Sequence, residues 1–275
     1  MKYVKVIVVA AFILALTVFI AAEVTELKNA DATKPEITSD REMLEIPCGY
    51  EEEQLLEGLF ASDQEDGDLT SQILVGEISR FIEKGISNVT YIVFDSANQP
   101  AILNRKVKFT DYKSPEFKLS KPLVFSVGQG NVDNLMKMIS AVDMLDGDVS
   151  QWITRTESNI NFQKEGTYQI TLETGNQYGD KATVQLPVHI CGRISQGIQI
   201  ELTSPLVYIN VGEEVNPLDF ISRISSATGE EIDKSKVTVE SALKTQTPGT
   251  YEIHYSLESG NGISGETWLT VVVRE

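Results

Sequence analysis

The feature that most constrains the fold of this chain is a pattern that recurs about every 80 residues. An Asp-Gly-Asp turn occurs at residues 66–68 and again at residues 146–148. A glycine that opens a run of alternating apolar residues occurs three times, at Gly85, Gly166 and Gly249. Landmarks at nearly constant spacing indicate a repeated structural unit rather than one continuous fold.

Each unit is written in the pattern of β-strands. After Gly249, for example, Tyr251, Ile253 and Tyr255 occupy every second position. Such alternation predicts strands, and about seven short strands in a unit of this size predict a β-sandwich. The end of each unit predicts a hairpin, with breaks at residues 95–101, 173–181 and 258–266. Short helical turns are expected near residues 54–60, 132–139 and 217–224.

These observations predict an all-β chain of three tandem sandwiches. We place them at residues 35–111, 115–191 and 197–275. The third is expected to diverge, because SSATGEEIDKSKV stands there in place of the acidic turn.

The first 22 residues predict a leader helix. Lys2 and Lys5 precede an uncharged apolar run at residues 6–22, which is at the short end of what spans a bilayer. The run predicts either a membrane anchor or a signal peptide cleaved before Glu23. In both cases the remainder is expected to be extracytoplasmic, after a polar tether at residues 23–34.

The motifs resemble those of a known family. The pattern A-x-D-x-x-D-G-D, a glycine shortly before Tyr168 and Tyr251, and the junction VKFTDYKSPEF are similar to tandem bacterial immunoglobulin-like (Ig-like) domains. Within that family, the motifs are most similar to the type of Ig-like domain found in pesticidal crystal proteins. The resemblance covers most of residues 34–111 and 115–190, and implies Ig-like sandwiches that serve as spacers or binding modules without catalysis. Tyr168 and Tyr251 suggest tyrosine corners, while the first copy has Ser87 instead.

The acidic turns allow three interpretations. In the first, which the resemblance also implies, their carboxylates hold the turn by accepting backbone hydrogen bonds. In the second, carboxylates bind calcium, although the spacing is not that of a known calcium loop. In the third, they form a catalytic pair, which a solvated and repeated turn disfavours. The candidate metal ligands are Asp63, Asp66, Asp68, Asp111, Asp143, Asp146 and Asp148.

Composition limits the partners. The formal net charge of −17 argues against nucleic acid and against anionic membrane surfaces. Cys48 and Cys191 could form a disulfide in an exported chain, but they lie far apart in the sequence and are interpreted as buried small residues. Neither has a metal-ligand spacing. His189 and His254 fall on the outward positions of their strands, so both are expected at the surface.

The two tryptophans bear on a carbohydrate hypothesis. Trp152 and Trp268 belong to different units and are expected in core or edge positions. An exposed pair would instead offer surfaces on which sugar rings stack.

Together these inferences predict a protein without enzymatic activity or a required cofactor. It would be a cell-surface rod of Ig-like modules, attached to the membrane through residues 6–22 or secreted, that binds an extracellular protein or glycan. The alternatives are a carbohydrate- or cell-wall-binding accessory module and a calcium-stabilised adhesin.

Overall fold

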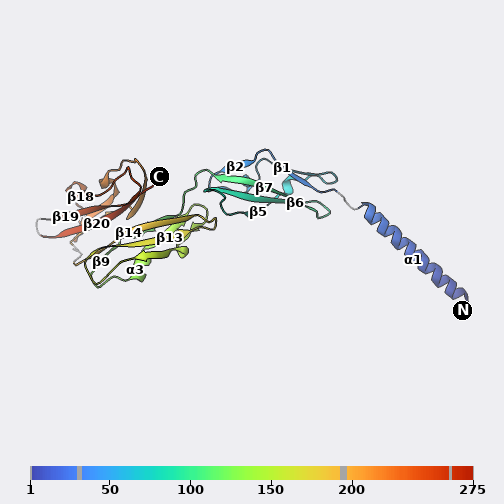
Figure 1. Ribbon diagram of the computed structural model, residues 1–275, viewed down its shortest axis with the longest axis horizontal. Helices are drawn as coiled ribbons and strands as arrows, with labels where there is room; N and C mark the ends of the chain where they lie inside the picture. Colours follow the sequence, from blue (N-terminus) through green and yellow to red (C-terminus); the bar gives the residue numbers. More distant parts are fainter. Residues whose placement is uncertain (1, 30–32, 193–196, 260–261, 275) are drawn as a thin grey trace. The chain divides into compact units, whose positions relative to one another are not determined.

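A computed structural model describes residues 2–29, 33–192, 197–259 and 262–274, and Figure 1 traces them. The chain divides into two compact units, residues 1–110 and 111–275. After an N-terminal helix, three successive segments are built of β-strands. We call them the first (36–109), second (116–191) and third (198–274) strand groups.

The N-terminal helix α1 spans Lys2–Asn29, so it includes most of the segment expected to be a polar tether. Its described apolar side chains are exposed; Phe12, Leu14 and Phe19, for example, are 67, 67 and 64% exposed. Within the described residues we find no helix whose length and apolar character suffice to cross a bilayer.

The first strand group contains two sheets, one in the order β1-β3-β4 and the other in the order β2-β7-β6-β5. The strands are β1 (Glu36–Ser39), β2 (Met43–Ile46), β3 (Leu59–Asp63), β4 (Gly67–Asp68), β5 (Leu74–Ile78), β6 (Ile86–Phe94) and β7 (Pro100–Phe109). Helix α2 (Glu52–Leu55) and the 3-10 turn η1 (Thr70–Gln72) lie between strands.

The second strand group repeats this arrangement. Its sheets have the orders β8-β10-β11 and β9-β14-β13-β12. The strands are β8 (Glu116–Leu119), β9 (Val124–Ser126), β10 (Ile139–Asp143), β11 (Gly147–Asp148), β12 (Thr154–Ser158), β13 (Gly166–Gly175) and β14 (Lys181–Cys191). Helix α3 (Val132–Met136) and the 3-10 turn η2 (Ser150–Trp152) complete it.

The third strand group keeps the same layout without a counterpart of β4 or β11 among its described residues. Its sheets have the orders β15-β17 and β16-β20-β19-β18. The strands are β15 (Ile198–Leu202), β16 (Leu206–Asn210), β17 (Ile221–Ser226), β18 (Thr238–Ser241), β19 (Gly249–Glu258) and β20 (Ser264–Arg274). The 3-10 turns are η3 (Pro217–Phe220) and η4 (Lys234–Lys236).

Every group splits its N-terminal segment between its two sheets. β1, β8 and β15 pair antiparallel within the smaller sheet. β2, β9 and β16 then run parallel to the last strand of the larger sheet. The alternation of apolar residues does not reveal this parallel pairing, because a strand buries the same face whichever way its neighbour runs.

The expected alternation produces the cores. In β13, Ile170 and Leu172 are fully buried, and in β14 so are Leu186 and Val188. They face Phe117 and the other buried residues of the smaller sheet in one cluster. The prediction of an all-β fold is confirmed, and the number of separate domains stays a prediction.

The predicted hairpins and corners are also present. The pairs β6–β7, β13–β14 and β19–β20 are antiparallel hairpins. The hydroxyl of Tyr168 donates to the carbonyl of Lys164, and that of Tyr251 to the carbonyl of Thr247, both at 3.0 Å. Ser87, at the matching position of the first group, is fully buried. Helical turns lie at α3 and η3 as expected, and α2 begins two residues before its expected segment.

The acidic turns depend on glycine conformation. Gly67 has a φ of +76°, and a Cβ added there would meet nothing within 4 Å. Substitution Gly67→Ala therefore isolates backbone strain, and we expect it to lower the free energy of unfolding by about 1 kcal/mol. Gly49→Ala in the same group is the control, since Gly49 also has open space but no positive φ.

We expect Gly49→Ala to leave stability unchanged or raise it slightly, because alanine restricts the unfolded chain. Urea unfolding monitored by circular dichroism measures both variants. Equal effects of the two substitutions would show that the acidic turn does not need its left-handed residue.

Candidate functional site

Each acidic turn is held by the carboxylate that ends the preceding strand. Asp63 Oδ1 accepts from the amides two and three residues later at 2.7 and 3.1 Å. Asp143 Oδ1 accepts the equivalent pair, both at 2.9 Å. The hydrogen bonds to Asp63 lower the pKa of its carboxyl group, and the one from the Glu65 amide has the largest effect. The first of the three interpretations, a structural role, therefore describes this pair.

The last aspartate of each turn caps the 3-10 turn that follows. Asp68 Oδ1 accepts from the Thr70 amide and Asp148 Oδ1 from the Ser150 amide, each at 2.9 Å. The hydroxyl of Thr70, followed by its amide, lowers the pKa of Asp68. The hydroxyl and then the amide of Ser150 lower the pKa of Asp148 in the same way. The Ser150 hydroxyl in turn accepts from the Ala141 amide at 3.0 Å.

The middle aspartate joins the turn to the hairpin of the other sheet. Asp66 Oδ2 accepts from the Ser96 amide at 2.7 Å, and Asp146 Oδ2 accepts from the Gln177 amide at 2.6 Å. Sequence analysis did not identify these hairpin partners, because a backbone amide carries no residue signature. The turn thus links both sheets of its strand group.

The seven candidate metal ligands do not form one cluster. In the described part of the chain, no three or more His, Cys, Asp or Glu side chains lie together as metal ligands. Asp111 is exposed and lies outside both acidic turns. Calcium binding by this full set stays a prediction, and the hydrogen bonds favour the structural role.

A polar cluster surrounds the second turn. The Tyr112 hydroxyl donates to Asp180 Oδ2 at 2.9 Å and lies 3.4 Å from Asp143 Oδ2. Asn176 Nδ2 donates to the Tyr112 hydroxyl at 2.8 Å and to Asp143 Oδ2 at 3.1 Å. Burial, followed by the hydrogen bond to Asp180, raises the pKa of Tyr112. The cluster ties the start of the unit 111–275 to the second acidic turn.

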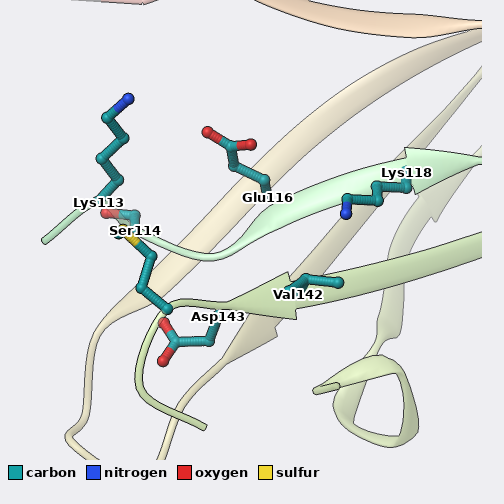
Figure 2. Close-up of a pocket in the computed structure, with 7 residues that line it drawn as sticks. Lys113, Ser114, Glu116, Lys118, Val142 and Asp143 are labelled. Carbon is teal, nitrogen blue, oxygen red and sulfur yellow. The ribbon is translucent and has the colours of Figure 1, made fainter. Parts of the chain in front are cut away.

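A shallow pocket of about 280 Å³ lies beside this cluster. Figure 2 shows its lining side chains, which come from the loop before β8, from β8 and from the end of β10. Of its two carboxylates, Asp143 is held by the cluster and Glu116 pairs with Arg274. The lining therefore carries two lysines, Lys113 and Lys118, beside these two carboxylates. Its lining is Lys113, Ser114, Glu116, Lys118, Val142, Asp143 and Met144.

The second and third strand groups meet at an aromatic stack. The ring of Trp268 lies 4.3 Å from that of His189 on β14 and 4.6 Å from that of His254 on β19, at interplanar angles of 17° and 20°. His189 Nε2 lies 2.6 Å from Glu252 Oε1, and Nδ1 lies 3.2 Å from the Thr167 hydroxyl. The third group thus covers a side chain of the second.

The expectation that His189 is a surface residue is therefore wrong, since it is only 9% exposed. Its position on β14 does face away from the core of the second group, as the alternation indicates. The third group packs against that outward face, which a pattern within one unit does not reveal. His254 keeps a partly exposed side chain, at 24%.

A second set of contacts supports the same joint. The Tyr208 hydroxyl, from β16, accepts from the Phe117 amide of β8 at 2.9 Å. The Arg274 guanidinium lies 5.2 Å from the centre of the Tyr208 ring and forms an ion pair with Glu116. Burial raises the pKa of Tyr208 to about 12. Leu206 is buried within the core cluster of the second group. We call the contacts of His189, Trp268, Tyr208, Arg274 and Leu206 the joint.

The sequence also singled out two cysteines and Trp152. Cys48 is buried as expected, whereas Cys191, at the end of β14, is only partly buried. Trp152 lies on η2 and is 38% exposed, so it is not in the core.

Comparisons with known proteins show that part of the chain is similar to a known family. Residues 208–272 match the family model of a bacterial Ig-like domain (group 3). The pesticidal crystal protein Cry22Aa of Bacillus thuringiensis is 26% identical over 223 residues, which cover 78% of this chain and 29% of that protein. The chain spans less than a third of the length of this relative. The resemblance to bacterial Ig-like domains is confirmed, and the matched segment lies in the unit that was expected to diverge.

Solved structures show only distant similarity. The CBM51-2 domain in complex with GlcNAc and INT domains of Clostridium perfringens ZmpB is 19% identical, with 55% of this chain and 26% of that chain covered and a TM-score of 0.24. The lipoprotein BT2262 of Bacteroides thetaiotaomicron is 11% identical, with 85 and 98% covered and a TM-score of 0.20. Scores this low carry no argument about this chain.

The lowered pKa values of Asp68 and Asp148 give stability a pH dependence. A carboxylate with a folded-state pKa below its unfolded value stabilises the fold above the unfolded pKa, near 3.8. That contribution is lost as pH falls through the folded-state pKa. We expect the free energy of unfolding to fall on acidification below about pH 4, and to fall less steeply in Asp148→Asn. Denaturant unfolding at several pH values measures this, and an unchanged slope in the variant would contradict it.

The joint predicts energetic coupling between His189 and Trp268. Aromatic stacks contribute about 0.5–1.5 kcal/mol beyond their buried area. A double-mutant cycle of His189→Ala and Trp268→Ala is therefore expected to give a coupling energy in this range. The control cycle pairs His189→Ala with Trp152→Ala, for which we expect additivity. Additive effects in both cycles would mean that the stack does not hold the two strand groups together.

Proposed function

We propose that this chain is a non-catalytic extracytoplasmic protein whose three strand groups are tandem Ig-like domains, at residues 35–111, 115–191 and 197–275. They would act as a spacer that presents an interaction surface outside the cell. The observation that carries the proposal is the joint, because a spacer needs neighbouring modules that hold each other. Bacterial Ig-like domains are generally non-catalytic, which is consistent with this role.

The joint is suited to hold neighbouring modules together, for physical reasons. It combines a buried aromatic stack with a hydrogen bond from the Phe117 amide to the Tyr208 hydroxyl, so both packing and polar groups are satisfied. The contact between His189 Nε2 and Glu252 Oε1 is largely shielded from solvent, with side-chain exposures of 11 and 26%.

The arrangement of the carboxylates supports a role without catalysis. In both acidic turns they accept hydrogen bonds from backbone amides, which is a structural use of the carboxylates.

The carbohydrate-binding alternative loses one of its two candidate side chains. The Trp268 ring already stacks against His189 and His254, so it is engaged within the protein and does not present a free aromatic face of the kind that the alternative needs. Trp152 alone remains exposed, and a single aromatic side chain is common on protein surfaces.

Export is the second part of the proposal and rests on residues 1–22. Two lysines precede an uncharged run, and the described apolar side chains of α1 are exposed. Such a segment serves as a leader that is retained as an anchor or cleaved before Glu23. The large negative charge keeps the exported part soluble and away from anionic surfaces.

Protease treatment of intact bacterial cells tests this function. We expect external protease to digest the strand groups while a cytoplasmic marker stays intact. The variant Leu14→Lys with Phe19→Lys is expected to abolish export, since a central lysine costs about 2.5–3.5 kcal/mol on insertion. Leu14→Ile with Phe19→Leu is the matched control. Digestion only after cell lysis, in the wild type, would contradict an extracytoplasmic role.

A further inference from the structure

The first strand group buries two carboxylates that each have an oxygen without a hydrogen-bond donor. Asp63 ends β3 and Asp95 directly follows β6, and they are only 8 and 7% exposed. Oδ1 of Asp63 accepts the turn amides, and Oδ1 of Asp95 accepts from the Gln99 amide at 2.7 Å. Oδ2 of each is buried and has no hydrogen-bond partner among the described residues. A buried anionic oxygen in this state is strongly unfavourable unless something else binds it.

The second strand group shows which residue the Asp95 position contacts. Its equivalent is Asn176, which directly follows β13 and whose Oδ1 accepts from the Asp180 amide at 2.9 Å, as Asp95 does from Gln99. Asn176 Nδ2 donates to Asp143 Oδ2 at 3.1 Å. The two side chains therefore meet at the end of the sandwich.

The hairpin contacts confirm that the two groups are equivalent here. Asp66 accepts from the amide of the residue after Asp95, and Asp146 accepts from the amide of the residue after Asn176. The first group therefore has two carboxylate acceptors where the second has a donor and an acceptor. From this equivalence we infer that Asp63 Oδ2 and Asp95 Oδ2 correspond to Asp143 Oδ2 and Asn176 Nδ2.

Three kinds of occupant can satisfy such a pair of carboxylate oxygens: a shared proton, a water molecule that donates to both, or a cation. Both Oδ1 atoms already accept amide hydrogen bonds, so each carboxylate has its Oδ2 left to bind an occupant. A divalent cation binds two carboxylates and balances the charge of the pair. Calcium accepts carboxylate oxygens at about 2.3–2.6 Å and completes its shell with carbonyl groups and water.

We propose that Asp63 and Asp95 form a divalent-cation site in the first strand group, with calcium as its ligand. The second group has no such site, because Asn176 supplies the missing donor. With two protein carboxylates the affinity is expected near 10⁻⁴–10⁻³ M, the range of extracellular modules. The proposal is independent of the function proposed above, since a purified chain reports it.

Calorimetric titration of the full chain in detergent micelles with calcium chloride tests the site. We expect one binding event, together with slower amide hydrogen exchange at residues 91–99 when calcium is present. The variant Asp95→Asn installs the arrangement of the second group. It is expected to lose at least tenfold in calcium affinity, and its exchange in chelator is expected to be slower than that of the wild type.

The matched control is Asp68→Asn, which removes a carboxylate charge from the same turn but keeps an acceptor for the Thr70 amide. It is expected to bind calcium as the wild type does. Three results would overturn the proposal. They are no calcium effect in the wild type, an equal effect in Asp95→Asn, and protection that appears only on acidification, which would indicate a shared proton.

Discussion

The arrangement of residues 111–275 depends on the joint between the second and third strand groups. Side chains of β14, β16 and β20 and a backbone amide of β8 make its contacts. His189 and Trp268 stack, Tyr208 accepts a backbone hydrogen bond, and Leu206 enters the neighbouring core. Each of these groups would be solvated if the strand groups separated, so separation exposes apolar surface and breaks buried polar contacts together.

Within a strand group, the acidic turn plays the corresponding role between the two sheets. One aspartate shapes the turn, one caps the following 3-10 turn and one holds the opposite hairpin. The third group uses a different solution, in which Ser226 accepts from the Glu230 amide across a turn with Gly229 at φ +85°. The fold therefore requires a satisfied turn at this position, and carboxylates are one way to provide it.

Much of the fold could be predicted because alternation and glycine position report local backbone geometry directly. The strands, the terminal hairpins and the corners of Tyr168 and Tyr251 all follow from such local signals. The parallel pairing of β2, β9 and β16 could not, because it changes no pattern of burial.

The candidate sites were harder to predict, because they depend on contacts between distant segments. The position of His189 indicates only that it faces away from its own core, and the joint arises because another strand group covers that face. Asp95 lies in a hairpin break where aspartate is an ordinary turn residue. Asp95 is recognised as a candidate ligand only by comparison with the Asn176 contact in the second group.

The central claim is that the joint makes the second and third strand groups one rigid unit. Backbone ¹⁵N relaxation of the isotope-labelled chain tests this most directly, because it reports the rotational correlation time of each group. A common correlation time for residues 116–191 and 198–274 is the result that the account predicts. Distinct correlation times for the two groups would contradict it.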